Sequence, residues 1–201
     1  GIDPIEIIDK HGADAFRFTL TFITSLGGQD IWLDKELFKM GGKFANKIYN
    51  SAKYIFRNIE DGETIKNIDK WILSRLQKAI ESTDKKLKEY RFDEASQTVY
   101  KFYWNEFCDW YIEISKFDLR ESSKREKTLS LLLYILEESM AMIHPFMPFL
   151  TEEIYFNLPK RNIESKSLMI REYPKAKSEY IFEDIEKEFD YIYSSGIFNL
   201  N

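Results

Sequence analysis

The chain has 201 residues, of which 44% are hydrophobic and 16% aromatic, and its formal net charge is −5. Such a chain can bury a substantial core, which excludes a disordered tail. The single cysteine, Cys108, excludes an internal disulfide framework, and two distant histidines would need recruited carboxylates to hold zinc, so we expect no metal site. No apolar run approaches the roughly 20 residues that span a bilayer, so the composition predicts a soluble, cytoplasmic protein.

The first part of the chain predicts three helices. In "DPIEIIDKHG", Asp3 can cap a short helix that Gly12 closes. The stretch 13–26 has the length of a helix and stops at a glycine pair, although its β-branched residues leave a strand as the alternative. A longer helix follows, from a cap at Asp34 to about residue 59, and the glycine pair 41–42 is a candidate interruption.

Three more helical patterns follow in the middle of the chain. They cover residues 68–89, 93–117 and 122–143, and a short turn separates the first two. Asp93 is the expected N-cap of the second. Within it, the segment "VYKFYWNEFCDWYIEI" is apolar almost all round the helical wheel, which predicts a buried central helix.

Prolines and acidic residues mark the end of the chain. His144-Pro145 and then Pro148 should stop or kink the preceding helix before a last one that ends at Pro159. Beyond it, "SLMIREYP" is a candidate extended segment and residues 181–193 form an acidic helical pattern. Long amphipathic helices with short connections predict an all-α, up-and-down helical bundle.

One stretch, "KMGGKFANKIYNSAKYIFRN" at 39–58, carries five basic side chains and no acidic one. On a helical wheel its apolar residues share one face, and Tyr54 falls on the other among lysines and asparagines. Cations neutralise phosphates, an aromatic ring stacks on a base, and amides read base edges, so this face has the parts needed to bind single-stranded nucleic acid. A solvated face, or one paired with acidic helices of the same domain, is the alternative.

Acidic residues elsewhere leave other interpretations open. Asp109 and Glu113 lie one helical turn apart, so they could pair with a basic helix or act as the acid and base of a helical enzyme. The adjacent pairs at 137–138 and 152–153 predict solvated faces, because neighbours in sequence do not face each other on a helix.

Several blocks resemble the C-terminal part of class I aminoacyl-tRNA synthetases of the valyl-tRNA synthetase family, in the same order and at the same spacing. They are "GIDPIEIIDKHGADAFRFTL", "GGQDIWLD", "FANKIYNSAKYI", "FCDWYIEISK" and "HPFMPFLTEEIY". The resemblance covers residues 1 to about 174. Isoleucyl, leucyl and methionyl relatives share several blocks more loosely, and "GGQDI" with "FCDWYIE" resembles the valyl branch most.

The resemblance implies three parts and a function in tRNA recognition. Residues 1–34 resemble the stem-contact segment that leans on the inner side of the tRNA. Residues 35–160 resemble the helical anticodon-binding domain, and residues 161–201 form an extension whose acidic run is not expected to touch phosphate. The function implied is recognition of the valine anticodon, which docks valine tRNA for ATP-dependent aminoacylation by a catalytic domain.

The resemblance also implies what lies elsewhere. In this family the lysine-serine signature loop and the nucleotide-binding fold with its histidine signature precede these blocks, and the chain opens on Gly1 rather than on Met. We therefore expect a piece of a longer ligase, non-catalytic by itself and without a cofactor, with ATP and Mg²⁺ belonging to the full-length enzyme. The expected partners are valine tRNA and the catalytic domain of the same chain, in a monomer.

The family's role gives the basic face a purpose. The predicted anticodon-binding residues are Lys43, Lys47, Asn50, Tyr54 and Arg57, with Lys35 and Lys116 at the rims of the bundle. In the stem-contact segment, Lys10 and Arg17 could reach the inner corner of the tRNA. The alternatives are the corresponding domain of an isoleucyl or leucyl relative, and a helical protein-interaction module that docks an acidic partner.

Overall fold

The computed structural model describes residues 3–24, 36–56, 67–159 and 165–194, with side chains up to residue 190. These ranges are helical and contain no strand, which confirms the all-α class. The helices are α1 (Pro4–His11), α2 (Ala13–Ile23), α3 (Leu37–Phe56), α4 (Asn67–Lys88), α5 (Phe92–Tyr100), η1 (Lys101–Ile112), α6 (Glu113–Asp118), α7 (Ser122–Ile143), α8 (Pro148–Phe156), η2 (Ser178–Tyr180) and α9 (Glu183–Ser194).

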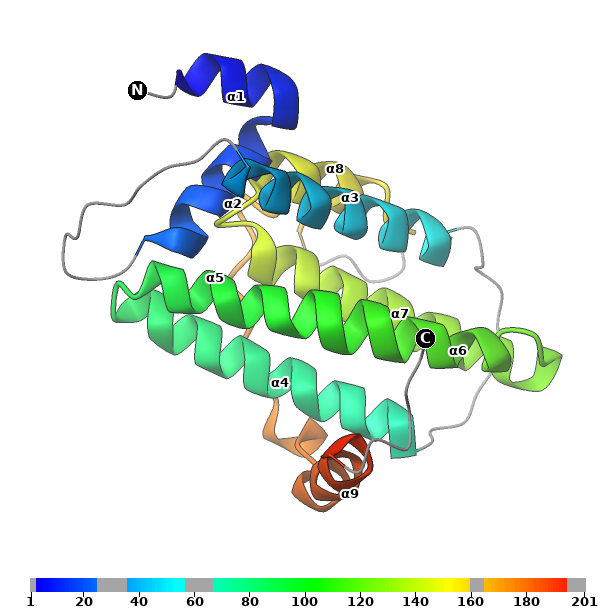
Figure 1. Cartoon of the computed structure of the whole chain (residues 1–201). Coiled ribbons are helices and arrows are strands. Elements are labelled where there is room, and N and C mark those ends of the chain that lie inside the picture. The colour runs from blue at the N-terminus through cyan, green and yellow to red at the C-terminus, as the bar shows by residue number, and fades with distance from the viewer. Residues whose placement is uncertain (1–2, 25–35, 57–66, 160–164, 195–201) are drawn as a thin grey trace.

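The helices form the predicted up-and-down bundle (Figure 1). The α4 helix packs against α5, and the continuous rod formed by α5, η1 and α6 packs between α4 and α3. The α7 helix contacts α3, α4 and α6, and α8 lies against α7 and α3. The acidic helix α9 lies at the base of the bundle on α4. Within the described ranges, no helix is long and apolar enough to cross a membrane.

The first two helices form as their caps predict. The Asp3 carboxylate accepts a hydrogen bond from the backbone N of Ile5 at 2.9 Å, and Pro4 occupies the first turn, where no N–H is needed. Gly12 ends α1 with a φ of 89°, a conformation that glycine adopts without steric cost. The stretch after it is a helix, α2, rather than a strand, and Phe18 on it is fully buried.

The α3 helix runs through its glycine pair without the interruption that the sequence suggested. Gly41 is buried against α2, where a Cβ would lie 2.4 Å from both the carbonyl oxygen of Ala15 and Oγ1 of Thr19. A Cβ on Gly42 would lie 3.6 Å from Nδ1 of His11, its nearest neighbour. Gly41 therefore serves close packing of two helices, and not a break in one.

This difference between neighbouring glycines is testable. We expect Gly41→Ala to lower the free energy of unfolding by about 1–3 kcal/mol, because the added methyl group overlaps backbone that cannot move away. Gly42→Ala, the matched control, should be neutral or stabilising by up to about 1 kcal/mol, because alanine favours the helix. Urea unfolding followed by circular dichroism measures both, and equal effects would contradict the packing role of Gly41.

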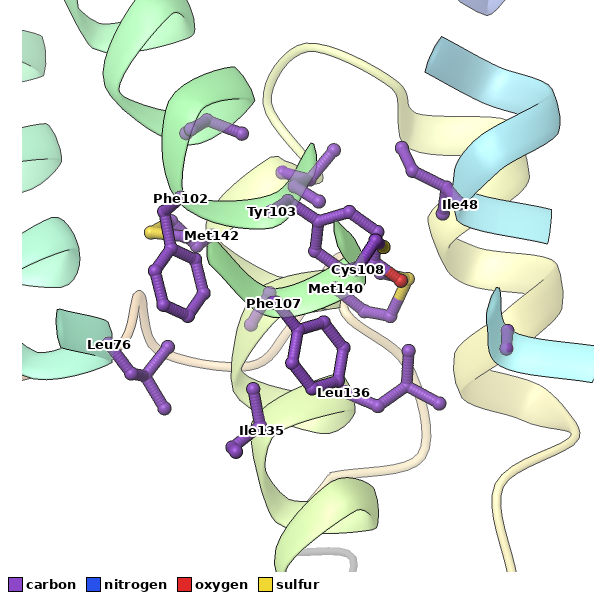
Figure 2. Close-up of a cluster of buried hydrophobic side chains, with 14 of the residues drawn as sticks. Ile48, Leu76, Phe102, Tyr103, Phe107, Cys108, Ile135, Leu136, Met140 and Met142 are labelled. Carbon is purple, nitrogen blue, oxygen red and sulfur yellow. The ribbon is translucent and has the colours of Figure 1, made fainter. Parts of the chain in front are cut away.

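The centre of the bundle is the predicted buried aromatic helix. Phe102, Tyr103, Phe107 and Tyr111 on η1 are almost completely buried. Figure 2 shows three of these rings between residues of α3, α4 and α7, among them Ile48, Leu76 and Leu136. This part of the rod has the wider π-helical hydrogen bonding, which the sequence pattern did not indicate.

Two local predictions are wrong. Asp93 is not the N-cap of α5, because the helix begins at Phe92 after Tyr90, whose φ is 59°, and no side chain caps it. The segment "SLMIREYP" is not extended throughout, because Leu168 to Ile170 form a turn.

Of the adjacent glutamates, Glu153 is exposed as predicted, but Glu137, Glu138 and Glu152 are not on a solvated face. Glu138 is 12% exposed and bonds Arg171 of the C-terminal extension, and Glu137 lies 3.5 Å from the same guanidinium. Glu152 accepts a hydrogen bond from the backbone N of Leu168 at 3.1 Å. These carboxylates fasten the extension to the bundle, a use that no pattern within their own helices could indicate.

The acidic helix α9 is held by a buried carboxylate. Glu186 accepts hydrogen bonds from the Ser74 hydroxyl, from Nη1 of Arg75 at 3.2 Å and from Nζ of Lys78 at 2.9 Å. Arg75 is also held by Glu106, at 2.5 and 3.0 Å. Burial raises the pKa of Glu186, but the hydrogen bonds outweigh it and leave the pKa below its ordinary value.

The lowered pKa makes the docking of α9 sensitive to acid. A carboxyl group with a depressed pKa in the folded state stabilises that state above its unfolded pKa, and this contribution is lost as the pH falls through the folded pKa. We expect Glu186→Gln to lower the free energy of unfolding by about 1.5–3 kcal/mol at pH 7 and by less below pH 4. Urea titrations at pH 7 and at a pH below 4 measure these free energies, and Glu188→Gln, a change of an exposed residue, is the control. If Glu186→Gln lowered the free energy of unfolding as much in acid as at pH 7, the role of the Glu186 carboxylate would be contradicted.

Candidate nucleic-acid interface

The outward face of α3 is the predicted basic surface, and the helix sorts its side chains as the wheel indicates. Phe44, Ile48, Ala52 and Ile55 are buried in the core. Lys43 and Asn50 are exposed, as are their polar neighbours on the same face, Asn46 and Lys53. The face is therefore presented to solvent by the burial of its opposite side.

Lys47 already has partners within the domain. Its Nζ donates to Oδ1 of Asp109 at 2.6 Å and lies 5.3 Å from the centre of the Trp104 ring. Both partners come from η1, which packs against α3. The alternative that the basic face pairs with an acidic helix of the same domain is thus correct for this residue. Trp104 was not singled out from the sequence, because an aromatic residue in an aromatic segment gives no signal of its own.

Tyr54 and Lys116 come together, although 62 positions separate them. Nζ of Lys116 lies 5.7 Å from the centre of the Tyr54 ring, a cation–π distance, and donates to both carboxylate oxygens of Glu113 at 2.6 and 2.7 Å. Tyr54 is half-buried against the core, and burial raises the pKa of its hydroxyl. One side of this ring is therefore already covered by a protein cation.

Of the other four predicted tRNA-binding residues, two lie within the described ranges. Lys35 and Arg57 lie outside them. Lys10 is exposed on the last turn of α1. Arg17 on α2 is exposed but donates from Nη2 to the carbonyl oxygen of Pro145 at 3.2 Å, which ties α2 to the turn between α7 and α8. Arg17 thus has a structural contact besides any role toward a ligand.

The arrangement offers little for acid–base or nucleophilic chemistry. Asp109 and Glu113, 45% and 49% exposed, each bind a lysine, which gives them structural roles in ion pairs. Burial raises the pKa of the Cys108 thiol to about 12, so it remains protonated at neutral pH. In the part of the chain that the structure describes, no three His, Cys, Asp or Glu side chains gather as metal ligands. What the face does offer is cations, amides and an aromatic ring on one helix, which are groups that can contact a nucleic acid.

A family model described as the anticodon-binding domain of tRNA ligase matches residues 69–195. This match spans more than half of the chain and takes in the central aromatic helix, α7, α8 and the acidic helix. The chain belongs to this family of anticodon-binding domains. The match extends beyond residue 160 to include α9, and it begins after α3.

Curated relatives of this anticodon-binding domain are valine–tRNA ligases. The ligase of Thermotoga maritima is 44% identical over 194 residues, which cover 94% of this chain and 22% of the relative. That of Treponema denticola is 43% identical, covering 91% and 22%, and that of Aquifex aeolicus is 35% identical, covering 94% and 18%. The chain therefore spans less than a quarter of the length of these relatives.

A solved structure has the same fold as the anticodon-binding domain. It is the ternary complex of LeuRS, tRNA and LeuAMS from Agrobacterium radiobacter K84, which superimposes with a TM-score of 0.68. The match covers 90% of this chain and 22% of that chain, at 17% sequence identity. At this identity the likeness concerns the helical architecture, and not the residues on its surface.

The pairing of Lys47 with Asp109 is open to a direct measurement. Because both side chains are about a third to a half exposed, we expect a coupling energy of only about 0.2–1 kcal/mol in a double-mutant cycle of Lys47→Met and Asp109→Ala. Thermal and urea unfolding of the four proteins provide the energies. A coupling above about 2 kcal/mol would make the pair a structural requirement and would remove Lys47 from the candidate interface.

Proposed function

We propose that this chain is the anticodon-recognition domain of a valine–tRNA ligase and that it docks valine tRNA through the outward face of α3. The observation that supports the proposal most is the identity of 35–44% to valine–tRNA ligases over more than nine tenths of the chain. The basic face of α3, with a half-buried tyrosine at its C-terminal end, agrees with such a role.

The proposed recognition uses each group according to its chemistry. Lys43, Lys47 and Arg57 attract the phosphates of the anticodon loop, and Asn50 reads a base edge. Tyr54 stacks its ring on a splayed base, and Lys116 lies over the same ring as a cation–π partner. The lysine pairs with Asp109 and Glu113 fix the cations in place, and a phosphate can share each lysine, because an ammonium group has three donors.

Binding at this distance from the reacting groups would serve catalysis elsewhere. Interactions with remote parts of a substrate orient its reacting end and can be used to raise the rate as well as the affinity. In this proposal the chain is the non-catalytic part of a monomeric cytoplasmic enzyme. It contacts the catalytic domain of the same chain, which would hold ATP and Mg²⁺, while Lys10 and Arg17 face the inner corner of the tRNA.

The anticodon role predicts a specific effect of Tyr54. We expect Tyr54→Ala to weaken binding of valine tRNA by about 5- to 150-fold, because base stacking contributes about 1–3 kcal/mol. It should also reduce the preference over the same tRNA with its two shared anticodon bases, adenine and cytosine, exchanged. Fluorescence anisotropy titrations at 50 and 150 mM salt measure both quantities.

Two controls separate stacking from folding. Tyr54→Phe keeps the ring and should bind as the unchanged protein does, and Tyr49→Ala removes a tyrosine that is 49% exposed on the same helix. If Tyr54→Ala folds normally and retains both affinity and anticodon preference, Tyr54 is not the stacking platform. If the unchanged chain binds both tRNAs equally, anticodon recognition itself is refuted.

A further inference from the structure

A second cationic surface lies on the other side of the central rod, between α4 and the α5–η1 segment. A groove of about 300 Å³ opens there, and its charged lining consists of Arg75, Lys78, Lys86, Lys101 and Glu106. Four cations and one carboxylate thus line a single groove of a chain whose net charge is −5. The hydroxyl groups of Ser82 and Thr98 complete the polar lining.

Carboxylates neutralise two of the four cations, because Arg75 binds Glu106 and Glu186, and Lys78 binds Glu186. The only carboxylate of the lining, Glu106, is committed to Arg75 through two hydrogen bonds. Lys86 is fixed by a neutral group, because its Nζ donates to Oγ1 of Thr98 at 2.7 Å. Lys101 is exposed and has no ion-pair partner among the described residues. Two of the four charges therefore lack a carboxylate partner there.

The spacing of the cations suits an extended polyanion. Lys78 and Lys86 lie eight residues apart on one face of α4, a rise of about 12 Å along the helix axis. Lys101, on the opposite wall, begins the π-helical segment η1. A single small anion could contact only part of this array, whereas a chain of phosphates could contact successive cations along it.

The α3 face and this groove differ in how their lysines are neutralised. On the α3 side of the rod, Lys47 and Lys116 each bind a carboxylate, Asp109 and Glu113. On the α4 side, Lys78 also binds a carboxylate, that of Glu186, but Lys86 binds a hydroxyl group instead. The rod lies between α3 and α4 (Figure 1), and η1 contacts both helices, so the α3 face and the groove belong to different sides of the rod.

We propose that the groove between α4 and α5–η1 binds the phosphodiester backbone of the RNA through Lys78, Lys86 and Lys101, as a contact separate from the α3 face. The inference rests on the proposed function, because it takes RNA as the ligand. The groove contributes sequence-independent affinity, since lysine side chains contact phosphates and do not read bases here. Specificity for the anticodon stays with the α3 face.

The test compares Lys86→Glu/Lys101→Glu with Lys187→Glu, a change of an exposed lysine on α9. Transcripts of valine tRNA and of the anticodon-exchanged tRNA are titrated from 50 to 200 mM salt. The double variant should bind both transcripts about tenfold more weakly at 50 mM salt, and its slope of log K against log salt should be shallower by about 1.5, as expected for two lost phosphate contacts. The ratio of the affinities for the two tRNAs should not change.

Failure of the groove proposal can be told apart from failure of the anticodon proposal. Thermal unfolding checks the fold, and Lys101→Glu alone, which breaks no hydrogen bond of the described residues, should show about half of the loss in slope. If the double variant binds with the same affinity and slope as Lys187→Glu, the groove proposal is refuted while an observed anticodon preference stands. If the groove variants lose affinity but the unchanged chain has no anticodon preference, the groove proposal holds and the anticodon proposal fails. No binding by the unchanged chain at 50 mM salt overturns both.

Discussion

The fold depends on the burial of one aromatic helix. Phe102, Tyr103, Phe107 and Tyr111 on η1 are almost completely buried, and a helix with so much apolar surface must be covered by several neighbouring helices. The hydroxyl groups of the two tyrosines then bind neighbouring helices. The hydroxyl of Tyr103 lies 2.7 Å from that of Ser51 on α3, and the Tyr111 hydroxyl donates to Asp69 on α4 at 2.7 Å. Because buried hydroxyl groups need partners, these contacts set the register of both helices.

The same rod distributes charge between two surfaces. Its α3 side offers carboxylates to lysines, and its α4 side offers Lys101 together with Glu106, which holds Arg75. Buried aromatic residues hold the backbone between these polar groups, so the ion pairs lie on a scaffold that does not depend on them. An acidic chain can in this way present locally positive surfaces, because the position of charge and not the total decides what a surface attracts.

Much of the fold could be predicted, because its signals are local. Asp3, Gly12 and the apolar periodicity of α3, α4 and α7 indicated helices that the structure contains. The failures are local patterns overruled by distant contacts. Gly41 suggests a break but provides space for α2, and Glu138 suggests a solvated face but binds Arg171. The candidate site was predicted only in part. A helical wheel identifies the exposed face of α3, but it cannot identify the residues of other helices that contact this face.

The sequence by itself determined the helical class, the buried aromatic centre and the basic face of α3, because each follows from periodicity and residue type within one segment. The tertiary structure alone decided which charges are neutralised. It paired Lys47 with Asp109, placed Lys116 over Tyr54, and brought Lys86 and Lys101 to one groove. The reason is physical: a wheel gives the direction of a side chain from its own helix, whereas a Coulomb interaction depends on the distance to groups that only packing brings near.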